Sequence, residues 1–209
     1  MKRIAISLLL ILMLPFGVQA QATTRGFTVY KEFQPATIHL ASGRQLKVSL
    51  ANIFLRNSGL LYVNDNYTKQ ANINTILQVD FKDRTYYRAD SLLAYRVDSL
   101  GADGLYCAQL IDIDAWNQMV RNNVELTSLD LGDMIGYSTV EMTNEQDLRL
   151  PVVKKYIFLL KGKFVLAQDR FLKRVLTKEK RRVVEAEAAR KDFSWTDERC
   201  LMELLKKLR

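Results

Sequence analysis

Few residues of this chain have the types and spacing that catalysis needs. His39 is the only histidine in 209 residues, so a metal site with two His ligands is excluded, and any Ser–His or Cys–His pair would depend on this one side chain. His39 alternates with Ile38 and Leu40, which predicts a solvent-facing position on a strand. The sequence contains no Gly-x-Ser-x-Gly, glycine-rich phosphate loop or His-Glu-x-x-His motif. The sequence therefore identifies no catalytic residue.

Carboxylates offer a second kind of chemistry. Asp112 with Asp114, and Asp98 with Asp103, come nearest to a calcium site, but neither set has the alternating oxygen ligands and distal Glu of an EF-hand loop. Helix capping and turn formation explain them, so neither a metal nor a cofactor is predicted. Two carboxylates at roughly 5 to 10 Å could hydrolyse a glycosidic bond, but the fold sets that distance and the sequence selects no pair. A carboxylate-dependent hydrolase of envelope or host polymer stays open as an alternative function.

The chain has two cysteines, Cys107 and Cys200. In an oxidising compartment they could form a disulfide that closes a long loop. The alternative is two separate buried thiols, because Cys107 lies in an apolar strand pattern and Cys200 on a leucine-rich helix pattern. The sequence leaves both states open.

Charge divides the chain into two regions. Residues 21–150 contain 12 Lys and Arg against 15 Asp and Glu, a net charge of −3, whereas residues 151–209 contain 17 against 8, a net charge of +9. The densest basic part is Lys178, Lys180, Arg181 and Arg182, which could bind an anionic surface such as lipid headgroups, lipopolysaccharide or an acidic polymer. The alternative is a solvated helix face. Nucleic acid is not an expected partner, because no basic groove interleaved with aromatic residues is visible.

The first 20 residues have the three parts of a secretory signal peptide. Lys2 and Arg3 are followed by an apolar run over 4–18 and by the small-residue end Val18-Gln19-Ala20. No later stretch is long and apolar enough to span a bilayer, so no transmembrane anchor is expected. The sequence predicts an exported protein, periplasmic or extracellular, whose mature chain begins at Gln21.

Elements that could position these residues follow from the apolar periodicity. Residues 35–88 predict a meander of short strands, in which Leu46, Val48 and Leu50 share one face, as do Leu77, Val79 and Phe81. Two further strands are expected over 91–97 and 105–111, a short helix over 112–120, and a strand over 137–142. A hairpin follows over 152–167.

The C-terminal part reads as helical from residue 168 onward. Leu201, Leu204, Leu205 and Leu208 recur at helical spacing, and Ser194 or Thr196 is expected to cap this last helix. The predicted fold is α+β: an antiparallel meander or small partly open barrel, then a hairpin and two to three helices. The predicted regions are the signal peptide 1–20, a β-rich domain 21–147, and a hairpin with basic helices 148–209 that packs on it.

Four stretches carry a resemblance to a known group. The leader, the meander IHLASGRQLKVSLANIFLRNSGLLY, the hairpin YIFLLKGKFV and the end DFSWTDERCLMELLKKL resemble uncharacterised exported proteins of Bacteroidota-type bacteria. The resemblance implies a cell-envelope setting and brings no catalytic residues. Such bacteria O-glycosylate Asp-Ser/Thr-aliphatic tripeptides, so Ser91 and Ser99 are the implied acceptors. The expected function is a non-enzymatic envelope protein, a structural or interaction module whose partner is an envelope protein or an anionic surface.

Overall fold

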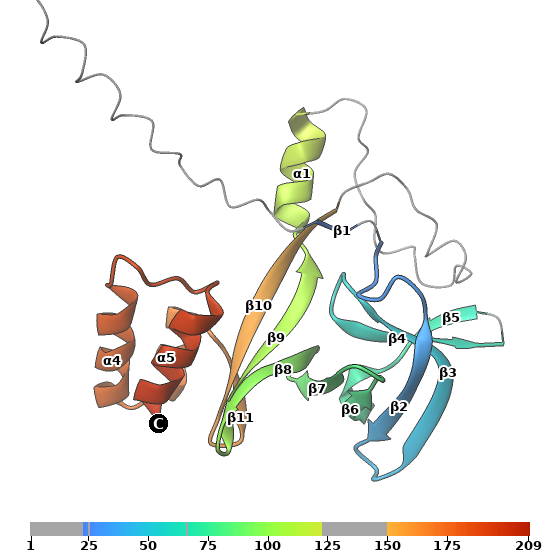
Figure 1. Cartoon of the computed structure of the whole chain (residues 1–209), viewed down its shortest axis with the longest axis horizontal. Coiled ribbons are helices and arrows are strands. Elements are labelled where there is room, and N and C mark those ends of the chain that lie inside the picture. Colours follow the sequence, from blue (N-terminus) through green and yellow to red (C-terminus); the bar gives the residue numbers. More distant parts are fainter. Residues whose placement is uncertain (1–22, 25, 66, 123–149) are drawn as a thin grey trace, which may run out of the picture.

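The computed structural model describes residues 23–24, 26–65, 67–122 and 150–209. It confirms the α+β class: a curled antiparallel sheet of eleven strands carries four α-helices in the described part, three of them at the C-terminal end (Figure 1). The predicted signal peptide, the strand over 137–142 and the boundary near residue 147 lie outside the described residues. The strands are β1 (Thr23–Thr24), β2 (Gln34–Leu40), β3 (Gln45–Phe54), β4 (Gly59–Asn64), β5 (Tyr67–Gln70), β6 (Ile76–Asp80), β7 (Thr85–Ala89), β8 (Leu92–Leu100), β9 (Asp103–Ile111), β10 (Leu150–Leu160) and β11 (Lys163–Leu166). The helices are the short 3-10 helix η1 (Ile73–Thr75), α1 (Ile113–Asn122), α3 (Asp169–Val175), α4 (Lys178–Ala188) and α5 (Glu198–Leu208).

Two meanders make up the sheet. The first runs β2-β3-β4-β5, and the chain then returns through η1 so that β6 pairs with the other side of β2. The second runs β6-β7-β8-β9-β10, and β11 folds back on β10 as the predicted hairpin. Because β10 pairs with β9 over eight residue pairs, one sheet runs from the half barrel, strands β2 to β8, into the C-terminal region.

Bulges curl the half barrel and change which residues face its core. In the β2–β3 pair, Gln34 lies opposite Ala51 but Ala36 lies opposite Val48, so β3 carries one extra residue. Such a bulge bends a strand and shifts its alternation. Ala51 therefore faces the core, while Leu50 is 42% exposed. The prediction that Leu46, Val48 and Leu50 form one buried face is wrong for Leu50, and Leu46, nearer the projecting end of the hairpin, is 39% exposed.

A second bulge lies in β6. His39 pairs with Gln78 but the next residue, Leu40, pairs with Ile76, which leaves Leu77 as the extra residue. Leu77 is 47% exposed, whereas Ile76 and Val79 are buried. The predicted face of β6 is thus correct for Val79 and wrong for Leu77.

Backbone hydrogen bonds between strands that are not neighbours in the sheet close the half barrel. Leu93 N–H donates to the Ser58 carbonyl at 2.9 Å, and the Ser58 hydroxyl donates to the Leu93 carbonyl at 2.6 Å. Leu55 N–H donates to Phe27, and Ile111 N–H donates to Leu55, both at 2.8 Å. These bonds join the β3–β4 turn to β8, to β9 and to the segment before β2.

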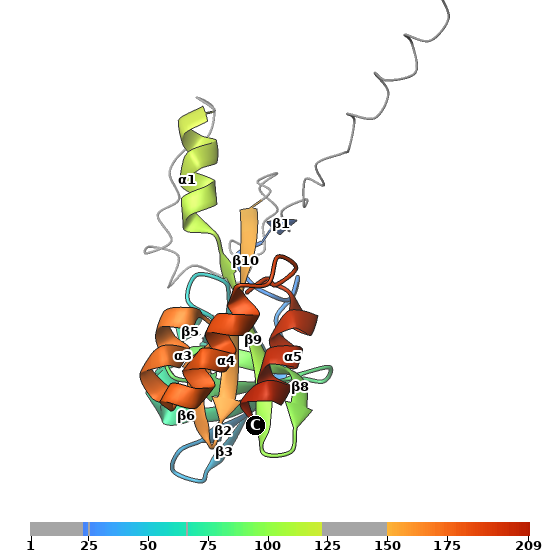
Figure 2. The same cartoon turned by 90° about the vertical axis from the view of Figure 1, so that its left-hand side faces the viewer.

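The C-terminal helices cover the other end of the sheet as a second layer (Figure 2). The predicted ridge of α5 is confirmed: Leu201, Leu204, Leu205 and Leu208 are all buried against β9 and β10. The N-cap of α5 lies one residue after Thr196 and three after Ser194, so neither expected cap is correct. Asp197 is its N-cap, because its carboxylate accepts the backbone N–H groups of Arg199 and Cys200.

Candidate binding groove beside strand β11

A hollow lined by described residues lies beside the short strand β11. A pocket of about 430 Å³ is bounded by β10, β11, helix α3 and the β7–β8 turn. A second hollow of about 700 Å³ shares Asp90 and Phe164 with it and continues toward η1, β6 and β7. The two together are called the β11 groove below. The volume of the first falls within the range of ~300 to 1,000 Å³ that is common for ligand sites.

Aromatic rings form the floor of this groove. The Tyr87 ring meets the Tyr106 ring edge to face at 5.6 Å between centroids, and Tyr106 meets Phe164 in the same way at 5.1 Å. These rings come from β7, β9 and β11, and they contact one another across the intervening strands β8 and β10. Phe164 and Tyr87 line the groove, and the buried Tyr106 ring contacts both of them; the three rings are called the aromatic floor below.

Helix α3 supplies the opposite wall because its apolar stripe is wider than the core can cover. Leu172 and Leu176 are buried in the core beneath the helices. Phe171 and Val175 line the groove; Phe171 also packs against the edge of that core, whereas Val175 is 54% exposed. The apolar residues of α3 thus contribute both to the core and to the lining of the groove.

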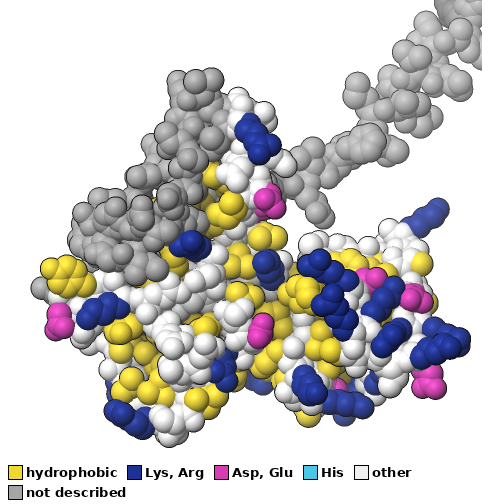
Figure 3. All heavy atoms as spheres, turned by 180° about the vertical axis from the view of Figure 1, so that it is seen from behind, with side chains coloured by type: hydrophobic (Ala, Val, Ile, Leu, Met, Phe, Trp, Pro, Cys, Tyr) yellow, Lys and Arg dark blue, Asp and Glu magenta, His cyan; other side chains and the backbone are white. Residues whose placement is uncertain are grey.

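Positive charge surrounds the apolar lining. Lys155 and Arg174 line the first hollow, and Lys163 and Arg88 line the second. The guanidinium carbons of Arg170 and Arg174 lie 4.5 and 5.7 Å from the centroid of the Phe171 ring. Asp90 is the single carboxylate among the lining residues of these two hollows. Viewed from behind, Lys and Arg side chains gather over the helical side of the molecule (Figure 3).

The basic cluster expected on α4 does not act as one free face. Arg181 Nε donates to the Leu176 carbonyl at 2.8 Å, and Lys180 Nζ donates to the carbonyl oxygens of Leu208 and Arg209 at the end of α5. These two cations satisfy helix and chain ends. Lys178 and Arg182 are exposed. Binding by the cluster stays a prediction that rests on these two side chains.

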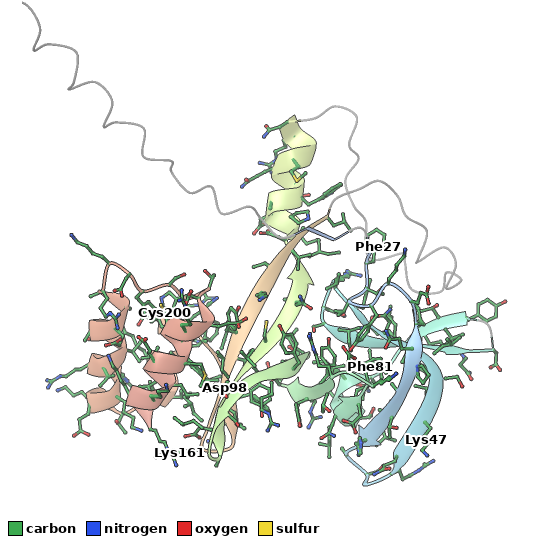
Figure 4. All side chains as sticks on the ribbon, in the orientation of Figure 1. Phe27, Lys47, Phe81, Asp98, Lys161 and Cys200 are labelled. Atoms are coloured by element: carbon green, nitrogen blue, oxygen red, sulfur yellow. The ribbon has the colours of Figure 1, made fainter. Side chains whose placement is uncertain are left out.

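Both cysteines are free thiols in this structure. Cys107 is fully buried in a row of cross-strand neighbours between Tyr95 and Tyr156, and burial raises the pKa of its thiol. Cys200, on α5, is partly exposed and lies 3.5 Å from the Asp192 carbonyl (Figure 4). The disulfide stays a prediction.

The Tyr156 hydroxyl, in the same row, connects the sheet to helix α5. It donates to Glu198 Oε1 at 2.9 Å, and Lys154 Nζ lies 3.1 Å from the same oxygen. Burial first, and then this bond to Glu198, raises the pKa of Tyr156. Desolvation acts to raise the pKa of Glu198, but Tyr156 and Lys154 outweigh it, so the carboxyl stays ionised. The arrangement anchors α5 to the sheet.

His39 is half-buried rather than fully solvent-facing. Its Nε2 lies 2.6 Å from Asp80 Oδ2 on the neighbouring strand β6. Asp80 also accepts from Gln78 at 2.7 Å and from Thr85 at 2.9 Å. The pair belongs to a local hydrogen-bond network on β2, β6 and β7.

Ser91 and Ser99, the implied glycosylation acceptors, are both exposed. Ser91 lies on the β7–β8 turn at the wall of the β11 groove, beside Asp90, whose φ is 59°. Ser99 lies at the end of β8, where its N–H donates to Asp98. Their modification stays a prediction. In the described part of the chain, no three or more His, Cys, Asp or Glu side chains gather in a group that could hold a metal ion.

Comparisons of the chain with protein-family models, with curated proteins and with solved structures find no match. None of the described helices is both long and apolar enough to cross a membrane. The groove residues are those that sequence reasoning missed, because lysines and arginines that are far apart in sequence carry no shared signal. The exposed side of the α3 stripe, Phe171 and Val175 beside Arg170 and Arg174, was the one local pattern that could have indicated the groove.

Proposed function

We propose that this chain is a non-enzymatic exported protein of the cell envelope, an interaction module whose β11 groove receives an acidic segment of a partner protein. The supporting observation is the lining: four Lys and Arg side chains and a single carboxylate around an aromatic floor. Rings contribute apolar contact area and cations select negative charge, which is the pattern of a protein-binding surface. The leader pattern in residues 1–20 supports export.

A charge reversal in the groove tests this proposal. The probe is a short synthetic peptide in which Glu and Val alternate, and its binding is measured by fluorescence anisotropy at low and high salt. The double variant Lys155→Glu and Arg174→Glu is expected to bind at least about tenfold more weakly, because two attractive contacts become repulsive. Wild-type binding is expected to weaken as salt rises.

A matched control uses the same change of charge on helix α4. Lys178→Glu with Arg182→Glu alters the net charge equally but lies outside the groove lining. It is expected to change peptide binding by less than about twofold. Equal binding by wild type and the groove variant would overturn the groove assignment. Loss of binding in the α4 variant alone would favour the predicted cluster instead.

Vesicles of phosphatidylglycerol form a separate arm of the experiment. They present negative charge without a peptide backbone, so they separate a lipid surface from a protein partner. We expect the alternating peptide to bind and the vesicles not to co-sediment the protein. Binding of the vesicles without binding of the peptide would contradict an acidic protein segment as the ligand.

A further inference from the structure

Strand β11 is an edge strand of four residues. Among the described strands it pairs with β10 alone, in the antiparallel register that places Ile157 opposite Leu166 and Leu160 opposite Lys163. An edge strand presents a row of unpaired N–H and C=O groups to its surroundings. In an antiparallel pair, residues with backbone groups directed toward the partner strand alternate with residues whose backbone groups point away, so the unpaired residues of β11 can be identified from one known hydrogen bond.

One hydrogen bond fixes that alternation. Ala167 N–H donates to the Tyr156 carbonyl at 2.8 Å, which makes this a hydrogen-bonded pair of the antiparallel ladder. Residues 163 and 165 are then bonded toward β10 in the same way. The backbone groups of Phe164 and Leu166 point away from β10.

Three of these outward groups are available for a partner. The Leu166 carbonyl accepts from Gln168 N–H at 2.8 Å. Among the described residues, none hydrogen-bonds to the Phe164 N–H, the Phe164 carbonyl or the Leu166 N–H. This edge thus carries two donors and one acceptor with the spacing of a strand.

The β11 groove runs along this edge. Phe164, Val165 and Leu166 all line it, although side chains of consecutive strand residues point to opposite faces. A hollow can contact all three only if it lies beside the strand rather than above one face. The groove therefore exposes the free backbone groups to its occupant.

We infer that the acidic segment enters the groove as an extended strand, which pairs with β11 and continues the sheet. This inference rests on the proposed function. Side chains of an added strand alternate between two faces: one face meets Phe171 and Val175 of α3, and the other lies on the side of Lys155. A segment in which apolar and acidic residues alternate satisfies both faces. Free backbone groups give affinity, and the cations select the acidic side chains.

Two substitutions at one position test the backbone contact with the same alternating peptide. Phe164→Pro removes the outward N–H without removing a ladder bond to β10, and proline is tolerated at such an edge position. Phe164→Val also loses the ring but keeps the N–H, so it is the matched control. We expect the proline variant to bind about tenfold more weakly than the valine variant, because a peptide carbonyl loses its donor.

Amide hydrogen exchange gives a second readout in the unaltered protein. Addition of the peptide is expected to slow exchange at Phe164 and Leu166, and to leave Val165, already bonded to β10, unchanged. This measurement decides the question if the proline variant does not fold.

The outcomes separate the two proposals. If the proline and valine variants bind alike and neither outward amide becomes protected, while charge reversal at Lys155 and Arg174 still abolishes binding, strand addition is overturned and the groove proposal stands. If charge reversal has no effect, the groove proposal itself fails. Slowed exchange at both amides together with the loss in the proline variant supports strand addition.

Discussion

The half barrel, β2 to β8, and the helix-covered part, β9 to β11 with α3 to α5, share one sheet but complete it differently. In the half barrel, bulges bend the strands and backbone hydrogen bonds from Ser58 and Leu55 join strands that are not neighbours. In the helix-covered part, a layer of helices supplies the second face of the core, and the sheet ends in a free edge at β11. Both parts end in an edge strand, β5 in the half barrel and β11 in the helix-covered part, but the edge of β11 lies beside a hollow lined by cations.

Charge differs between the two parts in amount rather than in sign. Residues 34–100, which form the half barrel, contain 8 Lys and Arg against 5 Asp and Glu, a net charge of +3, whereas residues 151–209, which form nearly all of β10, β11 and helices α3 to α5, have a net charge of +9. Cations beside a free edge discourage pairing with a second copy of the same basic edge, because like charges repel. They favour an acidic strand in its place, which agrees with the groove proposal.

The largest expected effect comes from the helix layer. Leu204 is fully buried between α5 and the sheet, so Leu204→Ala removes packed volume and is expected to lower the free energy of unfolding by about 2 to 5 kcal/mol. Leu77→Ala, at the exposed bulge of β6, is the control and is expected to cost under about 1 kcal/mol. Urea unfolding followed by far-UV circular dichroism measures both. An unchanged midpoint for Leu204→Ala would show that α5 does not stabilise the sheet.

The closure of the half barrel predicts a smaller loss. Ser58→Ala removes the hydroxyl that donates to the Leu93 carbonyl inside the protein, and is expected to lower the free energy of unfolding by about 1 to 3 kcal/mol. Ser49→Ala, on the exposed part of β3, is the control, and its effect is expected to stay within about 0.5 kcal/mol. The same urea titration checks the pair. Equal midpoints for the two variants would mean that the Ser58 bond adds nothing to closure.

The spacing of apolar residues along the chain was enough to predict the helices and strands whose apolar side chains form one continuous buried face. The α5 leucines and the β10–β11 hairpin are such elements, because the period of their apolar residues matches the geometry of the element that forms. The bulges at Leu50 and Leu77 could not be predicted in this way. A one-residue shift depends on the partner strand, and both sequences alternate as if no bulge were present.

The candidate groove could not be assembled from the sequence for a related reason. Its walls come from residues 74–92 and 155–175, which meet only because β7, β8, β9 and β10 are neighbours in the sheet. Each of its cations is an ordinary surface residue when considered alone. The predicted cluster at Lys178 to Arg182 is denser in sequence, yet two of its members bind carbonyl oxygens at helix ends. Density along the chain therefore did not identify the cations that share one hollow.

The smallest expected effect is the pH dependence of the hydrogen-bond network at Asp80. Partial burial acts to raise the pKa of this carboxyl, but hydrogen bonds from Thr85, Gln78 and His39 outweigh it, so the pKa lies below its ordinary value of 3.8. The ionised form is then favoured by folding. Its contribution to stability is present above the ordinary pKa and is lost as the pH falls through the lowered pKa of the folded state.

Asp80→Asn removes this titration from the half barrel. Between about pH 6 and about pH 3, the urea midpoint of the wild type is expected to fall further than that of the variant, because the wild type must also protonate the Asp80 carboxylate that the fold holds ionised. Asp65→Asn, at the exposed β4–β5 turn, is the control and should follow the wild type. If Asp80→Asn and the wild type lose stability in parallel across this range, the network does not hold the carboxylate ionised. The hydrogen bonds to Asp80 would then stabilise the half barrel no more when the carboxyl is ionised than when it is protonated.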